Sequence, residues 1–167
     1  MTHRERAVLA LSLQQPDYVP TFELEYQLAP EMFGGDFLTE DALKGLSPKE
    51  TEKALAENAE FMVKVYSELG YSILPLHYLS LEHLIKTAKL INKLTHDEFL
   101  LTAHGDGTFA IPDGDGMLDF VYRLADEPEA VKAEARKMAD EAIERDKRLM
   151  DAGNGSLILC SDYCFNA

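Results

Sequence analysis

The chain has 167 residues, of which 46% are hydrophobic and 28% are charged, the proportions of a folded protein with a single domain. Thirty acidic residues against sixteen basic ones give a net charge of −14, which opposes the phosphate backbone, so we expect no nucleic-acid partner. No apolar run approaches the roughly 20 residues of a membrane span and the first residues carry no secretory pattern, so we expect a cytoplasmic protein without a membrane segment.

The first fifty residues contain one clear helix signal and one strand signal. Thr2 followed by Glu5 is a capping-box pattern, which predicts a helix near residues 3–14. Residues 19–26 alternate between apolar and polar side chains, which predicts a strand with Glu23 and Glu25 on its acidic face. Glycine and proline are frequent across residues 30–47, so we expect a loop there with no more than a short helical turn.

From residue 47 onwards, predicted helices and strands alternate. Ser47, Pro48 and Glu50 combine an N-cap, a proline at the first helical position and a capping box, and Gly70 ends the helix that they begin. Apolar runs predict strands at residues 71–78, 99–103 and 155–162, and helical patterns follow Ser80 and occupy residues 118–124 and 126–153. This alternation favours an α/β fold with a parallel sheet.

Two parts of the chain carry a resemblance to a known family. They are the opening Thr2-His-Arg-Glu-Arg-Ala-Val-Leu-Ala-Leu11 with Gln15-Pro-Asp-Tyr-Val-Pro20, and Ala125-Asp-Glu-Pro-Glu-Ala130, which leads through a long helix to Ser156-Leu-Ile-Leu-Cys-Ser-Asp162. In order and spacing, they resemble the uroporphyrinogen decarboxylase superfamily, in its cobalamin-dependent methyltransferase branch. The resemblance implies a (β/α)8 TIM barrel about twice as long as this chain, with the ligand pocket at the carboxyl ends of the strands. We therefore expect residues 1–167 to form a single partial (β/α) barrel domain, the amino-terminal half of such a barrel.

The resemblance also implies a reaction class and partners. Members of this branch transfer methyl groups to or from a corrinoid protein, so we expect cobalamin to be carried by a partner and a small molecule to donate or accept the methyl group. A second half-barrel, either another polypeptide or a second copy, would complete the site. The zinc site of the branch uses a His-x-Cys pair and a later cysteine, and the chain contains no His-x-Cys, so we expect no metal site within it.

Two other functions remain open at this stage. One is a decarboxylase or lyase of the same superfamily, although residues 22–26 stand where the decarboxylases carry an Arg-Gln-Ala-Gly-Arg motif that meets substrate carboxylates. The other is a non-catalytic subunit that docks a corrinoid protein through its acidic surface.

The candidate catalytic residues are His104, Asp106 and Asp162. His104 and Asp106 lie on a glycine-rich turn after a predicted strand, where a His–Asp pair could share a proton; the alternative is a tight turn in which the aspartate bonds its own backbone. Asp162 ends the last predicted strand, which faces the pocket in this family's layout, and could instead cap a following helix. Tyr163 beside it is a candidate binding residue.

The remaining candidate binding residues are Glu23, Glu25 and His77. His77 stands at the carboxyl end of a predicted strand and titrates near neutral pH, so it could orient a ligand or exchange a proton, or simply hydrogen-bond to a nearby loop. Glu23 and Glu25 share one face of their predicted strand, and paired carboxylates on an inner face need a ligand or hydrogen-bonding partners. The cysteines at positions 160 and 164 are interpreted as reduced thiols.

Overall fold

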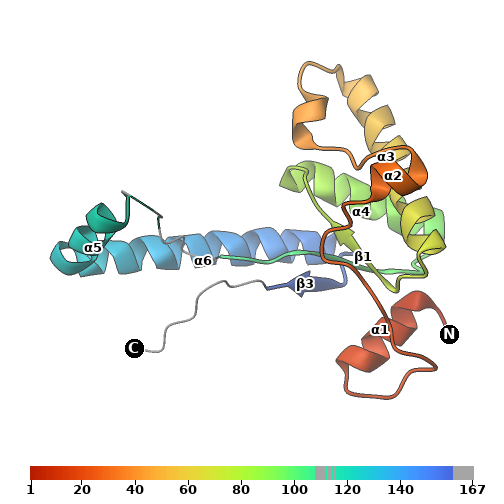
Figure 1. Ribbon diagram of the computed structural model, residues 1–167, viewed down its shortest axis with the longest axis horizontal. Helices are drawn as coiled ribbons and strands as arrows, with labels where there is room; N and C mark the ends of the chain where they lie inside the picture. Colours follow the sequence, from red (N-terminus) through yellow and green to blue (C-terminus); the bar gives the residue numbers. More distant parts are fainter. Residues whose placement is uncertain (108–111, 113, 115, 160–167) are drawn as a thin grey trace.

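The computed structural model describes residues 1–107, 112, 114 and 116–159, which form an α/β fold around a parallel sheet (Figure 1). The three strands, in the order β1-β2-β3, are β1 (Ile73–Leu76), β2 (Leu100–His104) and β3 (Ser156–Ile158), and both neighbouring pairs are parallel. Helix α4 (Leu81–Thr95) connects β1 to β2, and helices α5 (Gly116–Asp126) and α6 (Pro128–Asp151) connect β2 to β3. The predicted α/β class with a parallel sheet is therefore confirmed.

Local capping signals locate two of the helices correctly. Helix α1 (His3–Leu11) begins at the capping box of Thr2 and Glu5, and α3 (Pro48–Glu68) begins at that of Ser47 and Glu50. In the second box the Ser47 amide donates to the Glu50 carboxylate over 2.8 Å. Ser80 occupies the N-cap position of α4 as expected, but its side chain makes no capping hydrogen bond.

The segment between residues 29 and 47 contains more helix than predicted. A short helix, α2 (Ala29–Phe33), and a 3-10 helix, η1 (Glu40–Leu43), replace the expected loop. The Glu40 carboxylate attaches this segment to the start of α4, because it accepts the Ser80 amide at 2.7 Å and lies 3.0 Å from Nδ1 of His83. These bonds lower the pKa of Glu40, the Ser80 amide contributing most.

The predicted strand at residues 19–26 is wrong, although the segment lies where such a strand would pair. The Ser72 amide donates to the Thr21 carbonyl over 2.8 Å, and the His77 ring reaches the Leu24 carbonyl, so the segment follows β1 in the same direction. Phe22 and Leu24 stay 45% and 36% exposed, so their apolar face is not covered. Pro75 in β1 also lacks an N–H, which suits a strand at the edge of a sheet.

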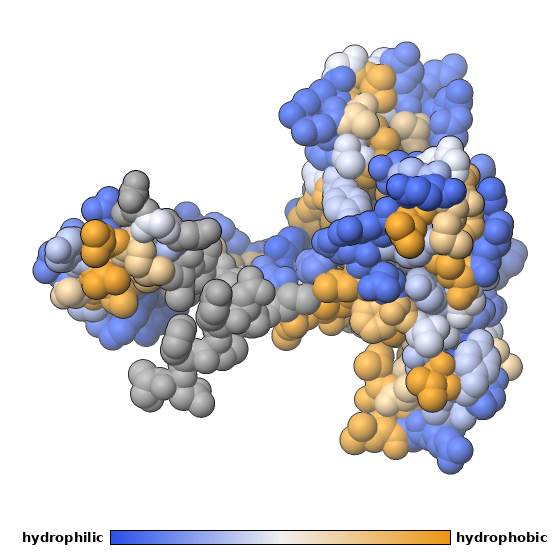
Figure 2. All heavy atoms as spheres, viewed as in Figure 1, coloured by the Kyte–Doolittle hydropathy of each residue, from blue (hydrophilic) through white to orange (hydrophobic). Residues whose placement is uncertain are grey.

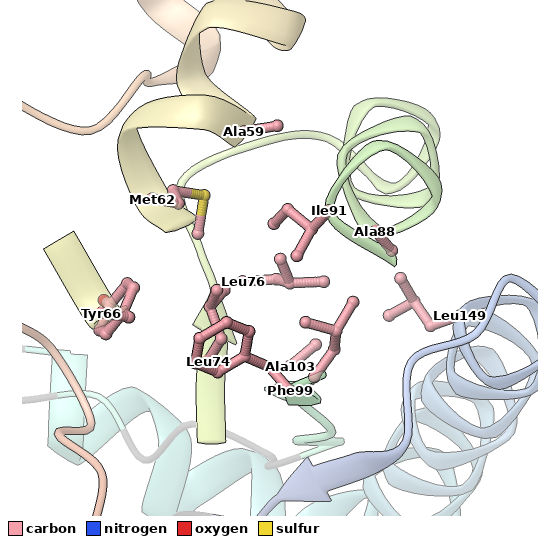
Figure 3. Close-up of a cluster of buried hydrophobic side chains, with 11 residues drawn as sticks. Ala59, Met62, Tyr66, Leu74, Leu76, Ala88, Ile91, Phe99, Ala103 and Leu149 are labelled. Carbon is pink, nitrogen blue, oxygen red and sulfur yellow. The ribbon is translucent and has the colours of Figure 1, made fainter. Parts of the chain in front are cut away.

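The hydrophobic core lies between one face of the sheet and the helices (Figure 3). The register pairs Leu74 with Leu101 and Leu76 with Ala103, so these apolar side chains share that face. Against them pack the core residues of the helices, which are Ala59, Met62 and Tyr66 of α3, Ala88 and Ile91 of α4, and Leu149 of α6. Because side chains alternate along a strand, positions 77 and 104 belong to the opposite face. They lie side by side, since each follows one residue of the Leu76–Ala103 pair.

Helix α1 packs at the amino-terminal end of the strands. The Arg4 amide donates to the Glu98 carbonyl over 2.7 Å, and the His3 ring stacks on Phe99 with 5.1 Å between centroids. Arg6 pairs with Asp17 at 2.6 Å, and this hydrogen bond lowers the pKa of Asp17 to about 2. The end of the sheet opposite α1 carries His77 and His104.

Helix α6 extends away from the sheet and carries α5 at its far end (Figure 1). Five apolar side chains of α5 are more than a third exposed, and apolar surface gathers there in Figure 2; they are Met117, Leu118, Val121, Tyr122 and Leu124. None of the described helices combines the length and the apolar character needed to span a bilayer.

Candidate functional site

A cavity of about 300 Å³ lies at the carboxyl ends of β1 and β2. Its polar lining consists of Glu25, His77, Tyr78, His104 and Arg145, and leucine side chains form the rest. Three of the residues predicted from the sequence, Glu25, His77 and His104, therefore meet in one cavity. In parallel sheets, this end of the strands is where ligands bind.

His77 is held in one tautomer beside His104. The ring centroids of the two histidines are 5.0 Å apart. Nε2 of His77 lies 2.6 Å from the Leu24 carbonyl oxygen, which can only accept, so Nε2 carries the proton and Nδ1 has the free lone pair in the neutral ring. Burial lowers the pKa of His77, and the neighbouring His104 acts in the same direction, against the Leu24 hydrogen bond and the charge of Glu25. His77 is therefore a neutral hydrogen-bond acceptor near pH 7.

His104 lies beside Asp106, the residue that sequence analysis paired with it. Nδ1 of His104 lies 3.4 Å from Oδ2 of Asp106, and both side chains are about one-third exposed. At this distance the Asp106 carboxylate can orient the His104 ring through Nδ1. Nε2 is then the atom of His104 that can exchange a proton with a ligand.

Arg145 of α6 also lines the cavity. Nη2 donates to the Asp106 backbone carbonyl over 3.3 Å, and Nε pairs with Asp146 at 2.9 Å. Sequence analysis missed Arg145, because it is one of many charged residues along a long helix and only tertiary packing brings it to the cavity. A guanidinium in this position can bind an anionic group of a ligand.

Tyr78 follows His77 directly and was also missed. Its φ of 63° lies in the left-handed region, which a residue with a large side chain occupies only when its surroundings hold it there. The Tyr78 carbonyl accepts the Glu40 amide at 2.7 Å, and the Tyr78 ring lies 5.4 Å from that of His77. Its place immediately after a strand could have identified it as a candidate, by the same argument that identified His77.

The other predicted residues do not join this cavity in the described part of the chain. Glu23 is exposed and lies near Tyr71, where burial, together with the charge of Glu23, raises the pKa of the phenol. Asp162 and Tyr163 lie outside the described residues, as do the cysteines at positions 160 and 164. Within residues 1–107, 112, 114 and 116–159, no three histidine, cysteine or acidic side chains gather as a metal ion would require.

Comparisons with known proteins give no neighbour for this chain. No protein-family model matches it, and neither a curated protein nor a solved structure does. Function is therefore argued from the residues and the cavity.

Proposed function

We propose that this chain is a uroporphyrinogen decarboxylase-like protein that transfers a methyl group to or from a corrinoid protein, as one half of a (β/α)8 barrel. The observation that carries the proposal is the pair of neighbouring histidines, His77 and His104, in a cavity at the carboxyl ends of parallel strands. The resemblance in sequence supports the reaction class, and the cavity supplies the acid–base groups.

The two histidines suit different parts of such a reaction. A methyl group that leaves an ether oxygen or an amine nitrogen leaves behind a lone pair that needs a proton. His104, paired with Asp106, donates that proton from Nε2, while neutral His77 accepts a hydrogen bond at Nδ1 and orients the ligand. The cobalamin, held by the partner protein, supplies the cobalt that carries the methyl group.

The edge of the sheet supports completion by a second half-barrel or by self-association. In the described part of the chain, β3 is an outer strand. Beside it lies a cavity of about 480 Å³, whose apolar lining comes from Ile143, Met150 and Leu157. Outer strands and exposed apolar surface favour association with a further strand and helix.

A decarboxylase or lyase reaction is the second candidate, and Arg145 is the observation that favours it. Its guanidinium lines the cavity, where it could bind a substrate carboxylate. Because Arg145 is already paired with Asp146, a carboxylate ligand has to compete with that ion pair.

The proposal is tested by anaerobic incubation of the purified chain with methylcobalamin and a small thiol. Absorbance follows the loss of the methyl group, and light scattering measures the mass of the particle. We expect an associated particle that changes the corrinoid spectrum and removes the methyl group. In this direction the thiol loses its proton as the methyl group is transferred, so His104 would accept that proton at Nε2, and His104→Asn should slow the reaction by about 100-fold or more, as loss of a general acid–base group does.

His96→Asn is the matched control, since His96 is exposed at the end of α4, outside the cavity lining. An associated particle that leaves both the spectrum and the methyl group unchanged would contradict the methyltransferase proposal. Thermal stabilisation of the wild type by a tricarboxylate, absent in Arg145→Gln, would favour the decarboxylase instead.

A further inference from the structure

A second cavity, of about 220 Å³, adjoins the first through Tyr78, which lines both. Its walls carry three aromatic side chains, one carboxylate and two neutral polar groups; the lining residues are Tyr26, Gln27, Asp36, Phe37, Thr39 and Tyr78. The methyl-transfer proposal gives this cavity no role. An aromatic wall with a single carboxylate is an unusual lining, because it offers much apolar contact and a negative charge together.

Contacts behind the cavity hold two of its aromatic rings in place. Phe37 stacks on Tyr66 with 5.7 Å between centroids and an interplanar angle of 8°. Tyr26 makes an edge contact with Phe33 at 6.3 Å. The rings are therefore set by the packing of the surrounding segment before any ligand arrives, which lowers the entropy cost of binding.

The carboxylate of Asp36 is fixed next to these rings. Its Oδ1 accepts the Phe37 amide at 2.8 Å, so the charge lies at the turn that carries the Phe37 ring. Burial raises the pKa of the Tyr78 phenol, and the charges of Glu25 and Asp36 add to this effect, so both carboxylates act on Tyr78 from the two cavities. The electrostatic environment of the second cavity is negative, in keeping with the net charge of −14.

The backbone of Tyr78 indicates that its ring is retained at a cost. Its φ of 63° suits glycine or asparagine far better than tyrosine. Strain of this kind is often found at ligand-binding sites, where the surrounding structure holds it. Here it keeps an aromatic ring between the two cavities.

We propose that the cavity formed by Tyr26, Asp36, Phe37 and Tyr78 binds a methylated ammonium group. Aromatic faces carry negative charge density and attract quaternary ammonium ions, whose methyl groups also gain apolar contact with the rings. A carboxylate at the wall adds Coulombic attraction without requiring an N–H donor on the ligand. Ligands of this class are N-methylated amines and betaines.

The inference deepens the proposed function. It rests on that function only in making the bound ammonium ligand the methyl donor. Ammonium binding in the second cavity places the ligand next to His77 and His104, which line the first. Among the possible donors, this selects methylated amines over aromatic ethers. Ammonium binding itself depends on the cavity alone.

Choline and its uncharged analogue 3,3-dimethylbutan-1-ol are the probes, because they share shape and hydroxyl group and differ in charge. Ligand-observed NMR titrations at constant ionic strength give the two dissociation constants. We expect choline to bind at least about tenfold more tightly than the analogue, because cation–π attraction to the rings and Coulombic attraction to Asp36 act together on the cation alone. Equal affinities would overturn the inference, because they would show an apolar cavity that does not recognise charge.

Two variants test the named residues. Tyr78→Asn removes the ring while keeping a residue that tolerates the left-handed backbone, and Asp36→Asn removes the charge with little change of shape. We expect each variant to weaken choline binding by about fivefold or more. Tyr122→Asn is the control, since Tyr122 is a 65% exposed residue on α5 and should leave the affinity unchanged.

Wild-type affinity in both Tyr78→Asn and Asp36→Asn would place choline elsewhere and overturn the inference. Circular dichroism establishes that each variant is folded. The titrations contain no corrinoid, so their failure leaves methyl transfer untouched. Conversely, choline binding without any loss of methyl from methylcobalamin would retain the ammonium site and reject the proposed reaction.

Discussion

Replacing Leu149 with alanine tests whether one side chain attaches the long helix α6 to the sheet. Leu149 lies in the last turn of α6, is 1% exposed and belongs to the core cluster with Leu74, Leu76 and Ala88. Met150, the next residue, is 45% exposed and lies outside that cluster. The two residues share a helix turn and differ in burial, so they form a matched pair.

The expected loss of stability follows from this burial. Leu149→Ala removes every side-chain carbon beyond Cβ, at about 0.8 kcal/mol for each buried carbon, or roughly 2.4 kcal/mol in total. The cavity left between the sheet and α4 adds to this, which raises the expected loss to about 3–4 kcal/mol. Small domains have about 5–15 kcal/mol of stability, so the variant should lose a large part of its total. Met150→Ala should change stability by less than about 0.5 kcal/mol.

Urea unfolding followed by far-ultraviolet circular dichroism measures the difference. We expect the midpoint of Leu149→Ala to fall well below that of Met150→Ala, with similar slopes, because the slope reports the surface exposed on unfolding. Midpoints that agree within experimental error would refute the packing of α6 against the sheet. The position of Arg145 in the candidate site would then lose its support as well, since the same helix carries it.

Three further predictions concern caps, titration and close packing. Ser47→Ala should lower the free energy of unfolding by about 1 kcal/mol, because Ser47 makes a capping hydrogen bond. Ser80→Ala should lower it by less, because Ser80 makes no capping bond and its hydroxyl contributes only weakly at the Glu40 carboxylate; equal losses in chemical denaturation would argue against this distinction. Burial lowers the pKa of His77 from 6.5, so the unfolded chain binds the proton more readily than the folded chain. The contribution of neutral His77 to the free energy of unfolding is therefore fully present above about pH 6.5 and is lost as the pH falls through the lowered pKa. His77→Gln should flatten that part of the stability profile, and an NMR titration giving an ordinary pKa would contradict the burial. Gly155→Ala should lower the free energy of unfolding by about 1–3 kcal/mol, because the added Cβ would overlap the Leu100 side chain. Adding Leu100→Val to this variant should recover part of the loss in chemical denaturation. Strictly additive losses for the two substitutions would exclude the clash.

The elements predicted correctly are those whose signals are local in sequence. Capping boxes use residues three positions apart, so Thr2 and Ser47 located α1 and α3 without any tertiary information. Residues 19–26 have an equally clear local alternation, but a strand also needs a partner. A hydrogen-bonded ladder between this segment and β1 does not form, since Pro75 in β1 has no N–H to donate and Phe22 stays exposed instead of packing on a neighbour.

The candidate site likewise contains residues that local sequence signals predict and residues that they do not. His77 and His104 could be predicted because each stands at the end of an apolar run, and parallel strands bring such ends together. Tyr78 could have been predicted from its place after the same strand, although its backbone angle could not, and Arg145 depends on how α6 packs, which has no signature in the neighbouring residues. Sequence reasoning thus identified the edge of the sheet that carries the site and missed side chains that tertiary structure adds to it.

The register between β1 and β2 has a consequence for how homologous chains can differ in length. His77 and His104 are neighbours because Leu76 pairs with Ala103. A single-residue insertion or deletion within either strand would move its histidine to the other face of the sheet and separate the two rings, since side chains alternate along a strand. Length variation among homologues should therefore be excluded from these two strands, and the spacing from Ser72 to His77 should be invariant.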